Sequence, residues 1–184
     1  MRLKSLRDLF VEQLRDLYSA ETQLIKALPK MAKKAIDPQL KASFEQHLTE
    51  TQVQRDNLER IFQLLNENPS GHTCKAMKGI IEEAEDFLDE VDSDDVVDAG
   101  LIAAAQRVEH YEIAGYGTVR EFARELDEAR IETLLTKILD EEKSTDRKLT
   151  EAAESGINQK AETGDREPIR ETSFRTRYRK IKSI

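Results

Sequence analysis

The sequence predicts an all-α protein on three observations. Of its 184 residues, only seven are Gly and four are Pro, whereas 36% are charged. Long stretches consist mainly of Ala, Leu, Glu, Lys, Arg and Gln, which are good helix formers. Apolar residues recur at spacings of three and four, the period of a helix with one buried face. The length and the 38% hydrophobic content fit one domain with a single core, and we expect almost no strand.

The first two helices are expected at about residues 4–35 and 39–66, because the apolar residues within each segment form a stripe along one helical face. Pro29 lies inside the first run. It is expected to kink this helix or divide it in two, because proline lacks a backbone donor and crowds the preceding turn. Asp37 is the expected cap of the second helix, and Pro38 its first residue.

A shorter helix is expected at residues 73–90, after the breaker cluster Asn68-Pro69-Ser70-Gly71. It would pack across the long helices as part of a long crossover. Two further long helices are expected at about residues 95–125 and 128–155, and Gly156 is a natural stop for the last one. The elements therefore predict a four-helix bundle with one additional short helix.

The charge is unevenly distributed along the chain. The net charge is -8, yet residues 165–184 carry seven basic and three acidic side chains. We expect the bundle over residues 1–160 and a mobile basic tail over residues 161–184, where no helical stripe continues. The acidic body does not attract nucleic acid or anionic membrane by charge, so neither is an expected partner of the bundle.

The chain shows no targeting or membrane signal that we recognise. Its start lacks the apolar region of a signal peptide, and no apolar run approaches the roughly 18 residues of a membrane span. Cys74 is the only cysteine, so no internal disulfide can form and a reducing compartment is favoured. We expect a cytoplasmic protein.

Four glutamates interrupt otherwise apolar helical stripes, and their spacing repeats. Glu112 follows Glu21 by 91 residues, and Glu142 follows Glu50 by 92. Two helical hairpins related by a pseudo-twofold axis would leave this pattern, with one carboxylate from each helix converging at mid-height. Carboxylates are too costly to bury unpaired, so the pattern predicts positive charge at the centre of the bundle. A pair of metal ions fits best, and oxygen-rich sites suit iron and manganese.

The usual Glu-x-x-His signal of di-iron bundles is absent. Glu50 is followed three residues later by Val53, and Glu142 by Thr145. Other side chains on the same helices must then complete the ligand set. The candidates held in reserve are Gln54, Asp146, Glu109 and His47.

Structural interpretations remain open beside the metal hypothesis. Helices have many surface glutamates, and some fall on a stripe by chance. Glu109 is either a ligand or a supporting partner, and His47 also fits a hydrogen-bonded core histidine. His110 is expected at the surface, because it points about 100° away from its neighbouring carboxylates. The group His72, Cys74 and Met77 resembles a soft-ligand cluster, but packing explains it better because no second Cys or His follows at zinc-site spacing.

Three segments closely resemble the YciF-like stress-protein family of bacteria: DLYSAETQLIKALPKMAKKA, HLTETQVQRDNLERIF and AAQRVEHYEIAGYGTVREFA. The likeness extends over about residues 3–158. It implies a ferritin-like four-helix bundle similar to rubrerythrin in architecture, a homodimer, an association with stress responses and a dinuclear metal site. The metal ligands that the resemblance implies are Glu21, Glu50, Glu112 and Glu142, with Glu109, Gln54, Asp146 and His47 in reserve.

Two hypotheses for function follow. The first is a ferritin-like stress-response protein with two iron or manganese ions, which handles iron or reactive oxygen and has an oxidase or peroxidase type of activity. The second is a helical stress protein without functional metal, which acts through a homodimer or other partners. No nucleotide-binding loop or nucleophile-base pair is visible, so the sequence identifies no organic substrate.

Overall fold

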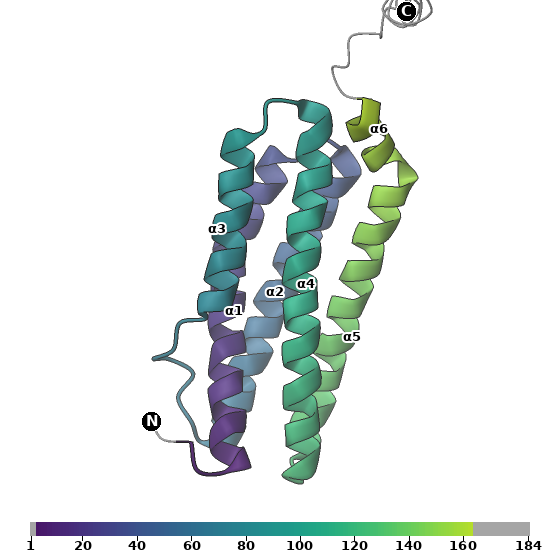
Figure 1. The fold of residues 1–184 in the computed structure, drawn as a ribbon. Coiled ribbons are helices and arrows are strands. Elements are labelled where there is room, and N and C mark those ends of the chain that lie inside the picture. The colour runs from purple at the N-terminus through teal and green to yellow at the C-terminus, as the bar shows by residue number, and fades with distance from the viewer. Residues whose placement is uncertain (1–2, 164–184) are drawn as a thin grey trace, which may run out of the picture.

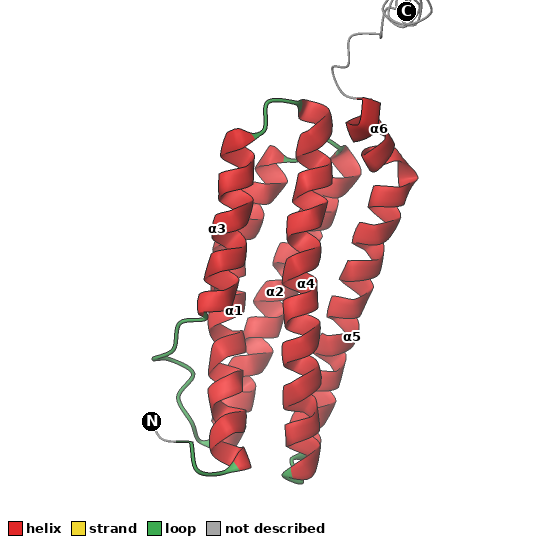
Figure 2. Cartoon of the chain, in the orientation of Figure 1, coloured by secondary structure: helices red, strands yellow, loops and turns green. Residues whose placement is uncertain are grey.

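The structure is a computed structural model that describes residues 3–163. All regular secondary structure in this range is helical, which confirms the predicted fold class (Figures 1 and 2). Four long helices form the bundle, and shorter ones lie in the crossover and at the end. The helices are α1 (Leu6–Lys34), α2 (Pro38–Leu65), α3 (Lys75–Glu90), α4 (Asp94–Glu125), α5 (Ala129–Ala152) and α6 (Asn158–Thr163), with a π-helical turn at Ala153–Ile157.

The long helices form two antiparallel hairpins, α1 with α2 and α4 with α5. In Figure 1, α1 rises and α2 descends, α3 rises again along the bundle, and then α4 descends and α5 rises. The crossover through α3 makes α2 and α4 parallel. The hairpins then pack with α1 against α4 and α2 against α5. This is the bundle with a long crossover that the repeated spacing predicts.

Capping side chains fix the corner between α1 and α2. The Asp37 side chain accepts hydrogen bonds from the backbone N–H groups of Gln39 and Leu40, and Pro38 stands at the first position of α2. The buried Asp98 carboxylate on α4 accepts from the backbone N–H groups of Ile36 and Asp37, each at 2.8 Å. The corner is therefore attached to the second hairpin, which fixes the level at which the hairpins face each other.

Two expectations about helix ends differ from the structure. α1 continues through Pro29 to Lys34, so of the two effects expected of this proline, a kink or a division, the division does not occur. Pro29 is exposed, whereas Leu28 and Met31 beside it are buried, so packing of the opposite face holds the helix together. Gly156 does leave helical geometry, with φ of 127°, but α6 follows it. Of the predicted tail, residues 161–163 belong to α6 and the rest lies outside the described residues.

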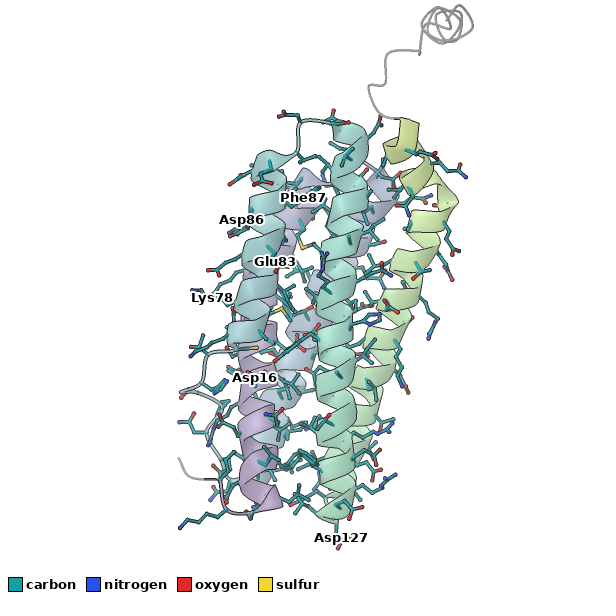
Figure 3. All side chains as sticks on the ribbon, in the orientation of Figure 1. Asp16, Lys78, Glu83, Asp86, Phe87 and Asp127 are labelled. Carbon is teal, nitrogen blue, oxygen red and sulfur yellow. The ribbon has the colours of Figure 1, made fainter. Side chains whose placement is uncertain are left out.

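α3 packs on one flank of the bundle, against α1 and α4. Its inner face buries Met77, while Lys78, Glu83 and Asp86 are exposed (Figure 3). A Cβ atom at Gly100 of α4 would lie 1.9 Å from Cζ of the Phe87 ring. The missing side chain at Gly100 therefore makes room for this ring between α3 and α4.

A polar layer divides the core in two. One apolar cluster surrounds Leu28, Phe44 and Leu101, and the other surrounds Phe10, Leu58 and Leu135. Between them lie buried polar side chains from all four long helices: Glu21, His47, Thr51, Gln54, Glu109, Glu112, Glu142 and Thr145. Six of the eight candidate site residues belong to this layer, and Glu50 and Asp146 are half-buried.

Candidate metal centre

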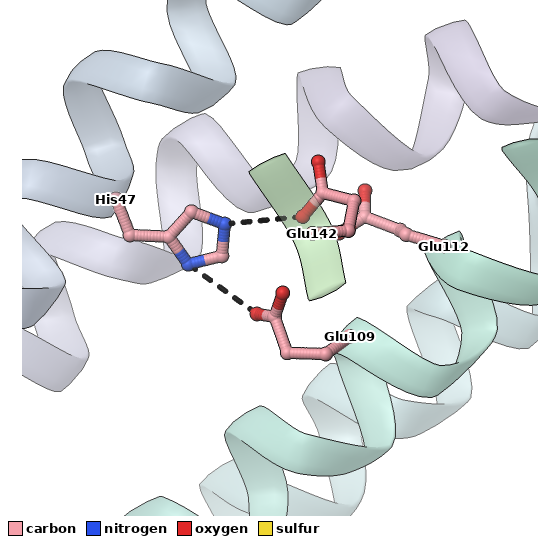
Figure 4. A group of neighbouring side chains, drawn as sticks. All are labelled: His47, Glu109, Glu112 and Glu142. Carbon is pink, nitrogen blue, oxygen red and sulfur yellow. Dashed lines mark ion pairs between the residues drawn. The ribbon is translucent and has the colours of Figure 1, made fainter. Parts of the chain in front are cut away.

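Four side chains converge in the polar layer, His47 from α2, Glu109 and Glu112 from α4, and Glu142 from α5 (Figure 4). One ligand atom of each lies within 4.8 Å of those of the other three. All four are buried. The spacing of Glu109 and Glu112 at i and i+3 places both on one face of α4, so one helix supplies two carboxylates.

Glu21 of α1 is the fourth buried carboxylate of the layer, with a fractional exposure of 0%. The phenol hydroxyl of Tyr116 donates a short hydrogen bond to its Oε1 atom. Tyr116 is itself fully buried on α4, so this bond joins the two hairpins inside the core. Burial, followed by repulsion from the charge of Glu21, raises the pKa of Glu112 well above the ordinary range.

His47 lies between two of the carboxyls. Its Nδ1 atom is 3.4 Å from Oε1 of Glu109, and its Nε2 atom is 3.8 Å from Oε2 of Glu142 (Figure 4). Although these distances suit ion pairs, burial lowers the pKa of His47 to about 4, so the imidazole is neutral at physiological pH. Nε2 has no hydrogen-bond partner among residues 3–163. A neutral imidazole with a free ring nitrogen is a competent metal ligand.

Burial dominates the protonation of the carboxyls. Desolvation, followed by repulsion from the charge of Glu142, raises the pKa values of Glu21 and Glu109 well above the ordinary range. The same desolvation raises the pKa of Glu142 to about 7. Without a cation, the layer therefore retains protons on carboxyls that would be ionised in water.

Many oxygen atoms of the layer have no hydrogen-bond partner among the described residues. Buried polar atoms are nearly always paired in folded proteins, so unpartnered carboxylate oxygens at one level of the core are unusual. Cations that these oxygens coordinate would satisfy them and offset the cost of their burial. The unpartnered carboxylate atoms are Oε2 of Glu21 and both oxygens of Glu109, Glu112 and Glu142.

Three further candidates, Glu50, Gln54 and Asp146, do not join the convergent group. Glu50 is half-buried and accepts a hydrogen bond of 2.8 Å from Nε2 of Gln46, and it does not join the convergent group. Gln54 is buried, and its Oε1 atom has no hydrogen-bond partner, while Nε2 donates to Glu141. Asp146 is half-buried, with a carboxylate oxygen 3.3 Å from Nε2 of His110. The convergent group thus contains two of the four primary candidates and two reserve candidates: Glu112, Glu142, Glu109 and His47.

The hydroxyls of Thr51 and Thr145 complete the polar layer. Each bonds a carbonyl in the preceding turn of its own helix, that of His47 at 2.9 Å and that of Glu141 at 3.3 Å. The sequence pattern does not mark Thr51 as a site residue, and it does not separate Tyr116 from the other tyrosines. The cross-helix contact of Tyr116 with Glu21 depends on the packing of α1 on α4, which no local spacing reveals.

His72, Cys74 and Met77, which follow Gly71, make polar and packing contacts with α1 and α3. His72 lies between Glu12 and Asp16 of α1, at 3.0 and 2.9 Å. The buried Cys74 thiol accepts a hydrogen bond from the backbone N–H of Met77 at the start of α3. These contacts attach the loop between α2 and α3 to the bundle.

A helical bundle with a long crossover and a buried layer of carboxylates defines the class of this protein: it is ferritin-like. In agreement, the fold matches a two-domain protein from Anabaena variabilis that contains a ferritin-like domain, with a TM-score of 0.54. That protein is 17% identical, and the match covers 84% of this chain and 38% of the other.

The chain belongs to the YciF-like family, because residues 5–162 match the family described as a domain of unknown function, DUF892. It is 42% identical to the protein YciF of Escherichia coli over 163 residues, which cover 88% of this chain and 98% of YciF. The crystal structure of that stress protein matches with a TM-score of 0.81 and 41% identity, covering 85% of this chain and 99% of the other. YcfI of Rhodopseudomonas palustris matches with a TM-score of 0.78 and 44% identity, covering 80% and 94%. Among the described residues, no helix has the length and apolar character of a membrane span.

Proposed function

We propose that this ferritin-like protein binds two divalent cations, iron or manganese, in its polar layer and handles iron or reactive oxygen during stress. The observation that carries the proposal is the buried set of carboxylates with unpartnered oxygens around the His47 imidazole. The stress role rests on the likeness to YciF of Escherichia coli, which is described as a stress protein.

Charge balance favours two cations over one. The layer holds four buried carboxylates, Glu21, Glu109, Glu112 and Glu142, and a neutral imidazole. Two divalent ions neutralise four ionised carboxylates, whereas one ion offsets only two of them and the other two must keep the protons that burial retains. Carboxylate oxygens with one imidazole nitrogen suit iron and manganese better than metals that prefer thiolates.

The residues present fit such a centre. The chemistry that bound iron supplies is one-electron exchange with dioxygen or peroxide. The protein supplies burial, which excludes water, and donors from four helices that hold their positions. The Tyr116 hydroxyl orients Glu21 through its hydrogen bond. The carboxyls of the layer release the protons that burial retains on them when a cation takes their place.

The test is an anaerobic titration of metal-free protein with ferrous iron, followed by measurement of iron per chain. We expect about two ions per chain in the natural protein and a loss of tight binding in Glu112→Gln, which preserves the size of the side chain. Glu83→Gln is the matched control, because Glu83 is exposed on α3. Uptake of fewer than about one ion per chain, or equal uptake by Glu112→Gln, would contradict the proposal and favour a stress protein without functional metal.

Rapid oxidation of the bound iron after addition of dioxygen or peroxide would separate redox chemistry from passive binding. The homodimer that the resemblance implies and the cytoplasmic location remain predictions. Light scattering of the full chain in solution tests the first of these, and fractionation of the cell that produces it tests the second.

A further inference from the structure

A hollow opens the polar layer to the surface between α2 and α5. Its volume of about 20 Å³ has room for one water-sized group. The wall contains polar side chains from both helices, among them His47 and Glu50 from α2 and Thr145 and Lys148 from α5. His47 also belongs to the convergent group, so the hollow borders the candidate metal centre at this side chain.

Glu50 lies closer to the surface than His47 in the wall of this hollow. It follows His47 by one turn of α2, so both side chains lie on one side of the helix. His47 is buried with an unpartnered Nε2 atom, whereas Glu50 is half-buried. Gln46, which is exposed, donates a hydrogen bond to one oxygen of the Glu50 carboxylate.

The other hollow near the layer has a different character. It lies between α1, α3 and α4, has a volume of about 30 Å³, and is lined mainly by apolar side chains such as Leu24, Met31 and Val108. Its one carboxylate, Glu85, forms an ion pair of 2.7 Å with Lys30. A hydrated cation loses water at this wall without gaining a ligand, so this hollow is a poor route for metal.

We propose that divalent cations reach the centre through the hollow between α2 and α5, and that Glu50 is a transient ligand on this route. The inference rests on the proposed function, since it concerns delivery to the same centre. A half-buried carboxylate replaces part of the hydration shell of the incoming ion before His47 and the buried carboxylates receive it. Lys148 on the opposite wall opposes this step by repulsion, because its charge has the same sign as that of the ion.

A transient ligand has a kinetic signature that separates it from a permanent one. Glu50→Gln should slow both association and dissociation of a cation by about tenfold, because it removes a negative charge from the hollow through which the cation enters and leaves. The equilibrium affinity should stay the same. Lys148→Gln should accelerate association, most strongly at low ionic strength, where charges are least screened. Stopped-flow absorption with Co²⁺, as a coloured stand-in for ferrous iron, measures both rates on the full chain.

Glu85→Gln, at the other hollow, is the matched control and should change neither rate. Two results would overturn the inference. Unchanged rates in Glu50→Gln would mean that cations use another route. Faster dissociation with weaker affinity would mean that Glu50 is a permanent ligand of the centre. If the natural protein takes up no Co²⁺ at equilibrium and no ferrous iron in the anaerobic titration, the proposed function fails first. The amplitude of the Co²⁺ absorption change thus tests whether metal binds at the centre. The rates of association and dissociation test the route by which the cation reaches it.

Discussion

Carboxylate side chains are buried to different degrees on the two flanks of the bundle. α3 packs over the flank formed by α1 and α4, whereas no described helix packs in that way over α2 and α5. The covered flank carries three fully buried carboxylates, Glu21, Glu109 and Glu112. The open flank buries Glu142 but leaves Glu50 and Asp146 half-buried.

Repetition in the sequence alone does not select the members of the convergent group, which takes His47 and Glu142 from the open flank and Glu109 and Glu112 from the covered one. Glu21 and Glu112 are equivalent in the repeat, and both are buried. Glu50 and Glu142 are equally equivalent, yet only Glu142 reaches the centre, while His47 supplies the ligand atom from α2. The open flank has the hollow with polar walls beside His47, and the covered flank has the mainly apolar hollow between α1, α3 and α4.

The largest expected effect is on metal affinity. It is tested by substituting one reserve candidate on each flank. Glu109→Gln should weaken ferrous iron binding about a thousandfold, or roughly 4 kcal/mol, because it removes a buried carboxylate from the centre. Asp146→Asn should leave the affinity nearly unchanged, since Asp146 lies near the exposed His110. Anaerobic competition with a chelator measures both constants. An equal loss in Asp146→Asn would show that the open flank also provides a permanent ligand through Asp146.

A second effect concerns the pH dependence of metal-free protein. The pKa of Glu142 is about 7 in the folded state and 4.5 for an ordinary glutamate. As pH rises, the Glu142 carboxyl loses its proton in the unfolded chain before it does in the folded one. The contribution of Glu142 to the free energy of unfolding therefore falls by about 3 kcal/mol between its unfolded and folded pKa values. The buried Glu21, Glu109 and Glu112, whose pKa values are also raised, act in the same direction.

His47 acts in the opposite direction. Its pKa falls from 6.5 to about 4 on folding, so its contribution is lost as pH falls through this range. Urea unfolding of chelator-treated protein on both sides of the window measures the net slope. Glu142→Gln should make stability less sensitive to rising pH, and bound metal should reverse the dependence, because ionised carboxylates are then the ligands. A slope identical in Glu142→Gln would show that Glu142 is already ionised in the metal-free layer.

The next effect tests how the covered flank is held together. Gly100→Ala places a methyl group on the Phe87 ring and should destabilise the protein by about 2 kcal/mol, since the ring must leave its place between α3 and α4. Gly117→Ala on the same helix is the matched control, because no atom lies within 4 Å of its added Cβ. It should stabilise α4 by up to about 1 kcal/mol. Thermal unfolding of both variants measures the contrast, and equal midpoints would mean that Phe87 moves without loss.

Much of the fold was predictable because its signals are local. Asp37 and Pro38 mark the start of α2, and residues 68–71 break the chain before α3, so the expected helix boundaries differ from the observed ones by at most three residues. The effect of Pro29 was not predictable, because it depends on which side of α1 faces solvent. The short α6 after Gly156 was also missed, since a glycine that ends one helix does not forbid another.

The candidate site was only partly predictable for a different reason. The repeated spacing finds Glu21, Glu112 and Glu142, because a carboxylate on an apolar stripe points into the core wherever the stripe is buried. It does not distinguish Glu50 from His47, one turn apart on α2. That choice depends on the lateral fit of α2 to α5 and on the absence of cover by a described helix, which are properties of the assembled bundle.

The smallest effect lies where the covered flank joins the two hairpins. Tyr116→Phe removes the hydrogen bond to Glu21 and should cost about 1 kcal/mol of stability in metal-free protein. The bond also lowers the pKa of Glu21, so its loss should raise that pKa further and weaken metal binding about tenfold. Tyr18→Phe is the matched control, because Tyr18 donates a comparable bond to Glu59 outside the polar layer. Similar destabilisation in both variants, with weaker metal binding in Tyr116→Phe alone, would assign Tyr116 to positioning of the centre. Equal metal affinities would instead leave it a purely structural role between α1 and α4.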